Sequence, residues 1–324
     1  MRTRKALTTV LLLLLTCAAT AQTQTKTARI GILCPVHCVG PGYTAFDDEL
    51  RKLGWVEGRN LAVERKASEG RYERLPELAA ELVRSKPDLI VAATTQPARA
   101  AKDATSDIPV VFSFVSHPVE MGLVQSLARP GGNVTGVTAL IPGAFLAKHF
   151  EITKDLLPGA QRVAVITNPA NESSRFAVLL EVPMASQMGL QVDVIEVREQ
   201  GNIPAAIVRA KNLGADALVI LGDSMLNTPP NRIPDLAAQA AIPAIYQNRD
   251  AALAGGLISY TPDLIVISRR HAQYVDRILR GASPSELPIE QPTKYDFVIN
   301  LKSAKDLGLT VLPSLLARAD EVIE

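Results

Sequence analysis

Several features that define other classes of protein are scarce or absent in this sequence of 324 residues. After the N-terminal segment, no apolar run reaches the roughly 20 residues that a membrane-spanning helix needs. Lysine and arginine nearly balance aspartate and glutamate, at 34 against 33, and no stretch concentrates basic residues. Nucleic-acid binding needs a concentrated basic face, so this class is excluded. The composition, 47% hydrophobic and 21% charged, is typical of a globular protein.

The N-terminal segment predicts export. Three basic residues among the first five precede an apolar run from 6 to 15, which is too short to span a bilayer. Ala19-Thr20-Ala21 has the small residues of a cleavage site, so we expect a signal peptide over 1–21 and an exported mature chain. A lipoprotein acylated at Cys17 is the alternative, although Thr16 is bulky for the residue before a modified cysteine.

Cysteine is rare. After the expected cleavage only Cys34 and Cys38 remain, and they flank Pro-Val-His. In an oxidising compartment we expect a local disulfide between them, with unpaired buried thiols as an alternative. A metal site formed by these cysteines and His37 would lack a fourth ligand and have unusual spacing. We therefore predict no metal and no cofactor.

Catalytic motifs are absent as well. The sequence has no Gly-x-Ser-x-Gly elbow, no phosphate-binding loop, no Gly-x-Gly-x-x-Gly and no His-Glu-x-x-His. Ser116 and His117 are neighbours, but adjacent residues at the end of a strand point apart, which argues against a nucleophile and its base. We therefore predict a binding protein rather than an enzyme. A hydrolase that uses Ser116 and His117 is an alternative.

The chain is organised around residues 108–140. Val110 to Val115 form an apolar, β-branched and aromatic run that is typical of a buried strand. Apolar residues from Met121 to Leu127 recur at helical spacing, and Val134 to Thr138 predict the next strand. A strand, a helix and a second strand make a parallel β/α unit, and such sheets bind ligands at the carboxyl ends of their strands.

The same order of elements returns roughly 130 residues later, which is too long for a solenoid repeat of about 20–50 residues. Residues 216–221 repeat the pattern of 88–93, and 242–246 repeat that of 108–112. A constant offset indicates a duplicated lobe. Because strands alternate with helices, we predict an α/β fold with two doubly wound parallel sheets.

The segments after the second repeat must complete lobes that are already formed. We expect one lobe to contain 28–138 and 259–291, and the other to contain 139–258 and 292–324. The chain would then cross three times between the lobes. A three-segment hinge of this kind restricts the motion to closure of the lobes on a ligand.

Polar and aromatic residues follow the predicted strands, where the two lobes would face each other. The N–H groups and dipole of the helices that follow favour a carboxylate by roughly 0.3–2 kcal/mol. Glu172 and Asp223 would suit an ammonium group, whereas the hydroxyls suit a carboxylate. These residue types also serve as helix caps and in turns, which is the alternative. The candidate ligand-binding residues are Tyr43, Thr94, Thr95, Gln96, Ser113, Ser116, His117, Asn168, Asn171, Glu172, Asp223, Ser224, Tyr246 and Tyr260.

Four segments carry a resemblance to a known family. They are Gly54–Asn60 (GWVEGRN), Glu69–Leu78, Leu127–Gly136 and Gln291–Lys294. With them, the chain from about Ala28 onward resembles the bacterial extracytoplasmic solute-binding proteins of ABC importers, which include tryptophan- and tyrosine-binding members. One departure is the residue before Pro118, where relatives commonly have Asp and this chain has a histidine.

The resemblance implies a type I periplasmic binding fold, a ligand in the cleft and docking onto an ABC permease in the inner membrane. We therefore expect a monomeric periplasmic receptor that binds a small organic solute and delivers it to the permease. The expected solute is an amino acid or an aromatic or carboxylate compound. A ligand-binding module that feeds a sensor kinase or chemoreceptor is the alternative.

Overall fold

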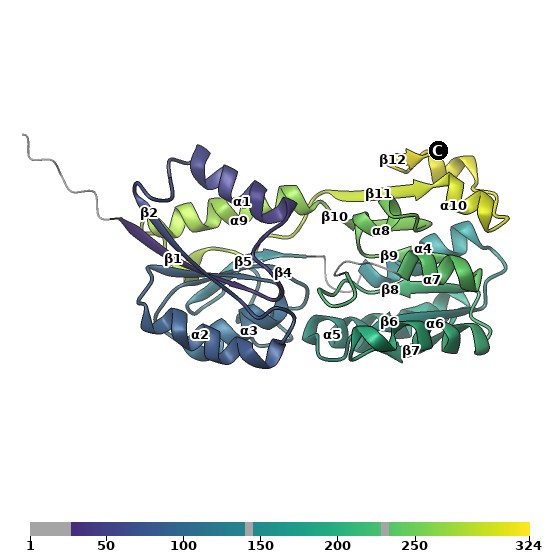
Figure 1. Cartoon of the computed structure of the whole chain (residues 1–324), viewed down its shortest axis with the longest axis horizontal. Helices are drawn as coiled ribbons and strands as arrows, with labels where there is room; N and C mark the ends of the chain where they lie inside the picture. Colours follow the sequence, from purple (N-terminus) through teal and green to yellow (C-terminus); the bar gives the residue numbers. More distant parts are fainter. Residues whose placement is uncertain (1–26, 140–144, 228–232) are drawn as a thin grey trace, which may run out of the picture.

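The computed structural model describes residues 27–139, 145–227 and 233–324, so the expected signal peptide and Cys17 lie outside the described residues. Two β-sheets, each flanked by helices, lie next to each other along the long axis of the molecule (Figure 1). We call the sheet nearer the N-terminus and its helices lobe 1, and the other sheet and its helices lobe 2.

The sheet of lobe 1 is parallel throughout, with the strand order β2-β1-β3-β4-β5. Its strands are β1 (Ala28–Cys34), β2 (Leu61–Ala67), β3 (Leu89–Ala93), β4 (Val110–Val115) and β5 (Val134–Thr138). Its helices are α1 (Pro41–Lys52), α2 (Leu75–Arg84), α3 (Thr95–Ala104) and α9 (Leu264–Leu279). The central strands are buried on both faces, which explains their unbroken apolar sequences.

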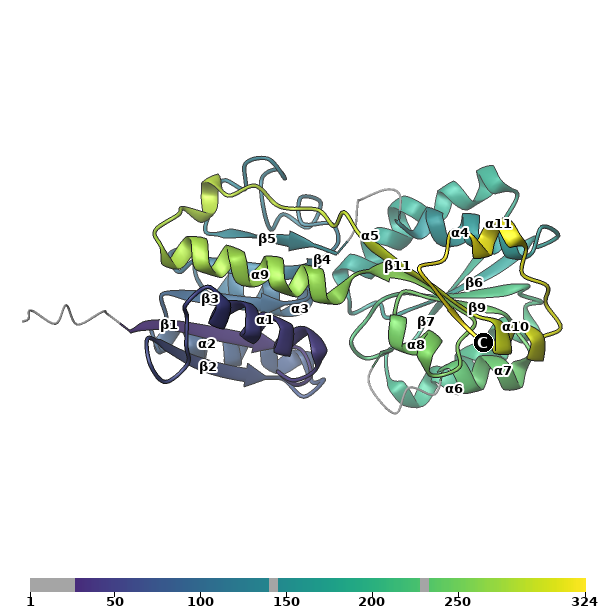
Figure 2. The same ribbon diagram turned by 90° about the horizontal axis from the view of Figure 1, so that it is seen from above.

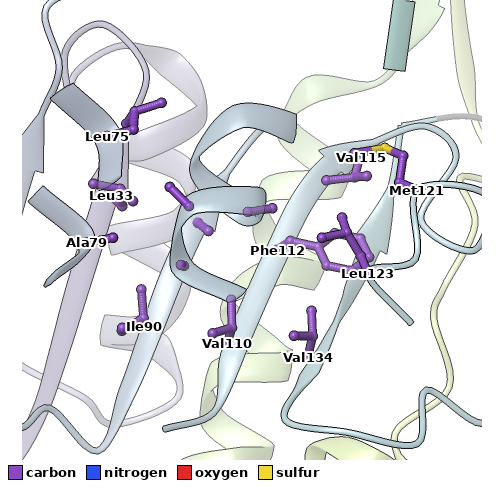
Figure 3. Packing of buried hydrophobic residues seen from close by; sticks show 14 of the residues in the cluster. Leu33, Leu75, Ala79, Ile90, Val110, Phe112, Val115, Met121, Leu123 and Val134 are labelled. Carbon is purple, nitrogen blue, oxygen red and sulfur yellow. The ribbon is translucent and has the colours of Figure 1, made fainter. Parts of the chain in front are cut away.

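Two hydrophobic clusters cover the two faces of this sheet. One joins α2 and α3 to the side chains of one face, as Figure 3 shows for Phe112 and its neighbours. The other joins α1 and α9 to the opposite face. In Figure 1 these two pairs of helices lie on opposite sides of the sheet. The late helix α9 therefore completes a lobe that the first third of the chain begins.

The helix expected after β4 is not formed. The segment from Met121 to Leu127 consists of a turn and bends, and Gly122 has a φ of 65°, outside the helical region. Met121, Leu123 and Val124 are nevertheless buried in the cluster with α2 and α3. The apolar spacing in the sequence therefore reflects burial of an irregular segment, and the prediction of a helix was wrong.

The sheet of lobe 2 has the order β12-β11-β10-β9-β8-β6-β7, and only β10 and β11 pair antiparallel among its described strands. Its strands are β6 (Arg162–Thr167), β7 (Gln191–Glu196), β8 (Ala217–Ile220), β9 (Ala244–Tyr246), β10 (Ile258–Pro262), β11 (Tyr295–Asn300) and β12 (Glu321–Ile323). Its helices are α4 (Phe145–Leu156), α5 (Glu172–Glu181), α6 (Ile203–Asn212), α7 (Ile233–Ala240), α8 (Arg249–Leu253), α10 (Leu301–Asp306) and α11 (Pro313–Leu316). The order β7-β6-β8-β9 repeats β2-β1-β3-β4, which confirms the predicted duplication and fold class.

The second crossing between the lobes lies later in the chain than expected. Tyr260 and its neighbours in β10 pair with β11, and the start of β10 pairs with β9, so 259–262 belong to the sheet of lobe 2. The chain crosses after Pro262 into α9 and returns to lobe 2 before β11 (Figure 2). Within the three described ranges, no helix is both long and apolar enough to cross a membrane.

Candidate ligand-binding site

A cavity of about 810 Å³ lies between the two lobes. Lobe 1 contributes the carboxyl ends of β3 and β4, and lobe 2 contributes those of β8 and β9. Residues next to the hinge, such as Phe145 at the start of α4 and Asp263 before α9, also line the cavity. Ligands of parallel α/β sheets bind at this edge. Eight of the candidate residues line the cavity: Tyr43, Thr94, Thr95, Ser113, Ser116, Asn171, Asp223 and Ser224.

The wall of lobe 1 presents the N-termini of α1 and α3. Neither helix has a side-chain hydrogen bond at its N-cap, Gly40 in α1 and Thr94 in α3. The first N–H groups of a helix have no partner within the helix, and they carry its partial positive charge. The hydroxyl of Thr94 is buried and has no hydrogen-bond partner among the described residues. This wall therefore offers donors that suit a carboxylate.

A buried contact crosses the cleft at the floor of the cavity. The hydroxyl oxygens of Thr95 in lobe 1 and Ser173 in lobe 2 are 2.7 Å apart. The backbone N–H of Ser116 donates to the same Ser173 oxygen at 3.1 Å. Beside them, Arg99 Nε donates to Glu172 Oε2 at 3.2 Å, also between lobes. These contacts hold the two lobes together next to the cavity.

The wall of lobe 2 is organised by Asp223, which is almost fully buried. Its carboxylate accepts from the side-chain amides of Asn168 at 3.1 Å and Asn171 at 3.0 Å. It also accepts from the backbone of Met225 at 2.9 Å and Leu226 at 3.3 Å. Burial raises the pKa of Asp223, although these hydrogen bonds oppose the rise. Three of these donors reach Oδ1 and one reaches Oδ2, so Asp223 fixes the turn after β8.

A charged pair lies where the hinge meets the cavity. Asp263 caps α9 by accepting from Ile265 N at 2.9 Å and Val266 N at 3.0 Å. Lys294 Nζ, on the segment that returns to lobe 2, donates to Asp263 at 2.9 Å. Burial alone would raise the pKa of Asp263, but these hydrogen bonds and the charge of Lys294 hold it below its ordinary value. The pair links two crossings of the hinge.

Aromatic side chains gather at the cavity although they make up only 4% of the sequence. Tyr43, Phe46, Phe114 and Phe145 line it. The whole chain has seven phenylalanines, six tyrosines and one tryptophan, and four of these aromatic residues therefore line one cavity. Burial raises the pKa of Tyr43, so its phenol stays neutral and can donate or accept a hydrogen bond. The cavity therefore combines donors for a carboxylate with a surface for a ring.

A disulfide precedes the segment of lobe 1 that forms the rim of the cavity. Cys34 and Cys38 are joined, with their Cα atoms 5.5 Å apart. The bond closes the loop before α1, and the next residue, Val39, lines the cavity with 75% of its surface exposed. Because both sulfurs are used in this bond, neither is a thiolate ligand for a metal.

His117 lies outside the cavity and is fully buried. Its ring packs against Phe176 of α5, with centroids 6.1 Å apart, and its Nε2 is 3.6 Å from Glu181 Oε1. Burial lowers the pKa of His117, and the charge of Glu120 only partly offsets this effect. His117 therefore takes part in a contact between the lobes and does not line the cavity.

Five other candidates also do not line the cavity. Asn168 supports Asp223, and Glu172 is paired with Arg99. Tyr246 is buried in the core of lobe 2, where burial raises its pKa. Tyr260 stacks on Tyr295, with ring centroids 5.2 Å apart, and Gln96 lies in the first turn of α3. Strand-end residues alternate in direction, which sends part of such a set into the core.

Other residues line the cavity without having been candidates. They include Ser173, Asn227, Asp263, Ser268, Lys294 and Asp296. Asp263 had a usable signal, because an Asp directly before an amphipathic helix is a common N-cap. Ser173 lies inside the first turn of α5, and Lys294 is brought to the site by the last hinge segment. Only the folded chain shows that these positions meet.

This arrangement defines a class: a two-lobed protein that binds a small molecule between parallel α/β sheets joined by a three-segment hinge. The sequence model of the family described as ABC transporter substrate binding protein matches residues 40–323. The chain belongs to this family. Its members are solute-binding proteins and not enzymes, so the hydrolase alternative based on Ser116 and His117 is set aside.

Known relatives agree with this assignment. The tyrosine-binding protein of Clostridioides difficile is 26% identical over 268 residues, which are 82% of this chain and 76% of that protein. The structure of an ABC domain in complex with L-Trp from Streptococcus pneumonia has a TM-score of 0.84 at 25% identity, covering 92% of this chain and 100% of that one. A leucine-binding protein from Thermotoga maritima, at 15% identity and a TM-score of 0.60, shares the type I periplasmic binding fold.

A ligand-free relative differs more. The open structure of a substrate-binding protein with adhesive properties from Clostridium difficile has a TM-score of 0.67, covering 91% of this chain and 99% of that one. Its identity, 25%, equals that of the L-Trp complex. Sequence divergence therefore does not explain the lower similarity. As a whole, this structure is therefore more similar to the L-Trp complex than to the open structure.

Proposed function

We propose that this protein is the periplasmic receptor of an ABC importer that closes its lobes on an aromatic amino acid or a related aromatic carboxylate. It would then present the solute to a permease in the inner membrane. The observation that carries this proposal is the cavity, which combines uncapped helix N-termini with aromatic side chains. Its volume of about 810 Å³ exceeds that of one amino acid, which leaves space for ordered water.

The relatives support this solute class. The curated relative is named for tyrosine binding, and a solved relative holds L-Trp. A carboxylate would lie on the wall of lobe 1, where the N-termini of α1 and α3 and the hydroxyl of Thr94 offer donors. The ring would pack against Tyr43 and Phe114.

Contacts across the cleft support closure. Thr95 reaches Ser173, and Arg99 reaches Glu172, each pair joining lobe 1 to lobe 2. The chain crosses between the lobes from β10 into α9 and again before β11, as Figures 1 and 2 show. A ligand that contacts both walls would favour the state in which these pairs are formed.

Binding can be tested directly with the purified mature chain. We expect L-tyrosine, L-tryptophan or 3-phenylpropionate to raise the melting temperature and to bind with micromolar affinity, about −8 kcal/mol, in calorimetry. Glycine lacks the ring and tryptamine lacks the carboxylate, so both serve as controls that should bind far more weakly. If none of the three aromatic carboxylates binds, the proposed solute class is wrong.

Export and transport need separate measurements. We expect the mature protein to be recovered from the periplasm as a monomer, with an N-terminus at Gln22 after cleavage. N-terminal sequencing and light scattering measure these properties. Uptake of the labelled solute should fail in cells that lack either this protein or its permease. Normal uptake without this protein would favour a role in sensing.

A further inference from the structure

Five non-glycine residues in the described part of the chain have a positive φ, and they fall into two groups. Glu69 lies in a turn, and Lys86 and Ala241 lie just after the ends of helices. Left-handed residues are common at such helix ends. Thr94 and Phe114 are different, because each lies at the carboxyl end of a strand and lines the cavity.

The backbone of Thr94 is unusual for its residue type. Its φ is 77° and its ψ is 177°, a region that is almost restricted to glycine. Threonine is branched at Cβ, so the steric conflict is larger than for most residues. Phe114 has a φ of 57°, which is also an outlier for a bulky side chain. Both positions therefore hold strain.

The surrounding sheet fixes both residues. Their strands are neighbours, and the last paired residues before them are Ala93 and Ser113. Thr94 N donates to Ser113 O at 2.8 Å, which links the two ends. The register of β4 shifts between Ser113 and Val115, so Phe114 occupies a bulge.

The strand on the other side of β4 packs tightly beside this bulge. At Gly136 of β5, an added Cβ would lie 2.1 Å from the carbonyl oxygen of Phe112, so only glycine fits there. Ala139 N then donates to Val115 O at 3.1 Å. Neighbouring strands therefore leave the bulge little freedom to relax, which is how a structure retains strain.

The strain places two complementary groups on the same wall. The Thr94 hydroxyl is buried and has no hydrogen-bond partner in the described ranges, although a buried hydroxyl ordinarily has one. The side chain of Phe114 is half-buried and lines the cavity. Strained residues of this kind concentrate at ligand clamps.

We propose that Thr94 and Phe114 are the residues of lobe 1 that determine solute specificity, and that their strained backbone is retained to hold them in place. The Thr94 hydroxyl donates a hydrogen bond to the carboxylate of the solute, and the Phe114 ring packs against the ring of the solute. This inference rests on the proposed function, since it assigns contacts within that cavity.

The decisive variant is Thr94→Gly, which removes the hydroxyl and the strain together. We expect its melting temperature to rise by about 2–4 °C, because glycine adopts this backbone freely. We expect its affinity for L-tyrosine and L-tryptophan to fall roughly tenfold or more, because a hydrogen bond to a charged group is lost. Thr94→Ser keeps the hydroxyl and should retain affinity within about threefold.

The ring is tested by Phe114→Leu, which keeps an apolar side chain. We expect it to weaken binding of the two aromatic amino acids while leaving binding of L-leucine unchanged or stronger. Phe114→Tyr restores a ring and should restore the wild-type preference. A uniform loss of affinity for all three amino acids would instead indicate a structural role and overturn the assignment of Phe114.

Lys86→Gly and Ala241→Gly are matched controls, because both residues have a φ of 52° but do not line the cavity. Both should raise the melting temperature and leave affinity unchanged. If wild-type protein binds a probe and Thr94→Gly binds it equally well, or melts at a lower temperature, the inference is wrong and the proposed function stands. If wild-type protein binds neither aromatic amino acid, both the proposed amino-acid ligand and this inference fail.

Discussion

The hydroxyl oxygens of Thr95 in lobe 1 and Ser173 in lobe 2 lie 2.7 Å apart, and both side chains are buried. Ser173 also accepts the backbone N–H of Ser116 at 3.1 Å. One hydroxyl of lobe 2 therefore satisfies two groups of lobe 1. These bonds form only when the lobes approach each other, so they stabilise the closed state relative to the open one.

Ser173→Ala should weaken solute binding. In the closed state it leaves Thr95 and the N–H of Ser116 buried without this partner, at a cost of about 1–3 kcal/mol. In the open state water can replace the lost partner. We therefore expect an affinity loss of roughly tenfold in calorimetry. Ser186→Ala removes a hydroxyl that bonds to Pro183 within lobe 2, and it should leave affinity unchanged.

The ion pair between Arg99 and Glu172 should contribute less than the hydroxyl contact. About 30% of each side chain is exposed, so water and salt weaken the attraction. We expect Glu172→Gln to reduce affinity by less than about 1 kcal/mol at low salt, with the effect vanishing at high salt. Asp155→Asn breaks the pair with Arg318 inside lobe 2 and should leave affinity unchanged at either salt concentration. A salt-independent loss would contradict this account.

The sequence predicted the fold because burial leaves a local record. The strands Leu89–Ala93 and Val110–Val115 are covered on both faces, so they read as unbroken apolar runs, and their repeats lie at a constant offset. The segment from Met121 to Leu127 also has regularly spaced apolar residues that are buried, but it does not form a helix. Apolar spacing reports which side chains are buried, and it does not distinguish a helix from an irregular segment such as this one, where Gly122 has a φ of 65°.

The site was less predictable because its geometry depends on contacts distant in sequence. Thr94 and Ser113 were accessible to sequence reasoning, since both lie at strand ends. His117 comes just after β4, the strand that contains Ser113, but α5 of the other lobe covers the histidine. Glu172 precedes Ser173 in the first turn of α5, yet Arg99 engages it. No local sequence pattern distinguishes a residue that faces the cavity from one that forms a contact between the lobes.

Stability should fall as the pH decreases below about 6.5, the ordinary pKa of histidine in an unfolded chain. Burial lowers the pKa of His149 and of His271 to about 4. Between these values the unfolded chain binds protons that the folded chain does not, so the free energy of unfolding rises with pH there and levels off above it. Each histidine contributes at most about 1.4 kcal/mol per pH unit. Urea denaturation at several pH values measures this slope.

The variant His271→Gln measures the contribution of this one histidine to the pH dependence of stability. The histidine Nε2 lies 3.0 Å from Val111 O, and a glutamine amide can donate to the same oxygen without titrating. We expect the slope between pH 4 and pH 6.5 to fall by up to about 1.4 kcal/mol per pH unit. An unaltered slope in His271→Gln would show that another group dominates.

The disulfide between Cys34 and Cys38 should affect binding as well as stability. Hydrogen bonds from Ser68, Glu69 and Gly70 hold the first half of its loop, at Cys34–Val36. The disulfide ties Cys38, and with it the cavity-lining rim from Val39 to Tyr43, to this anchored half.

Replacing both cysteines by serine should therefore destabilise the protein by about 2 kcal/mol, the chain-entropy value for so short a loop. It should also weaken solute binding severalfold, because the N-terminus of α1 loses its fixed position at the cavity. Addition of a reductant should produce both effects in the wild-type protein and neither in the serine variant, measured by urea denaturation and calorimetry. Reduction that lowers stability without changing affinity would show that the bond supports the fold alone and that the rim keeps its position without it.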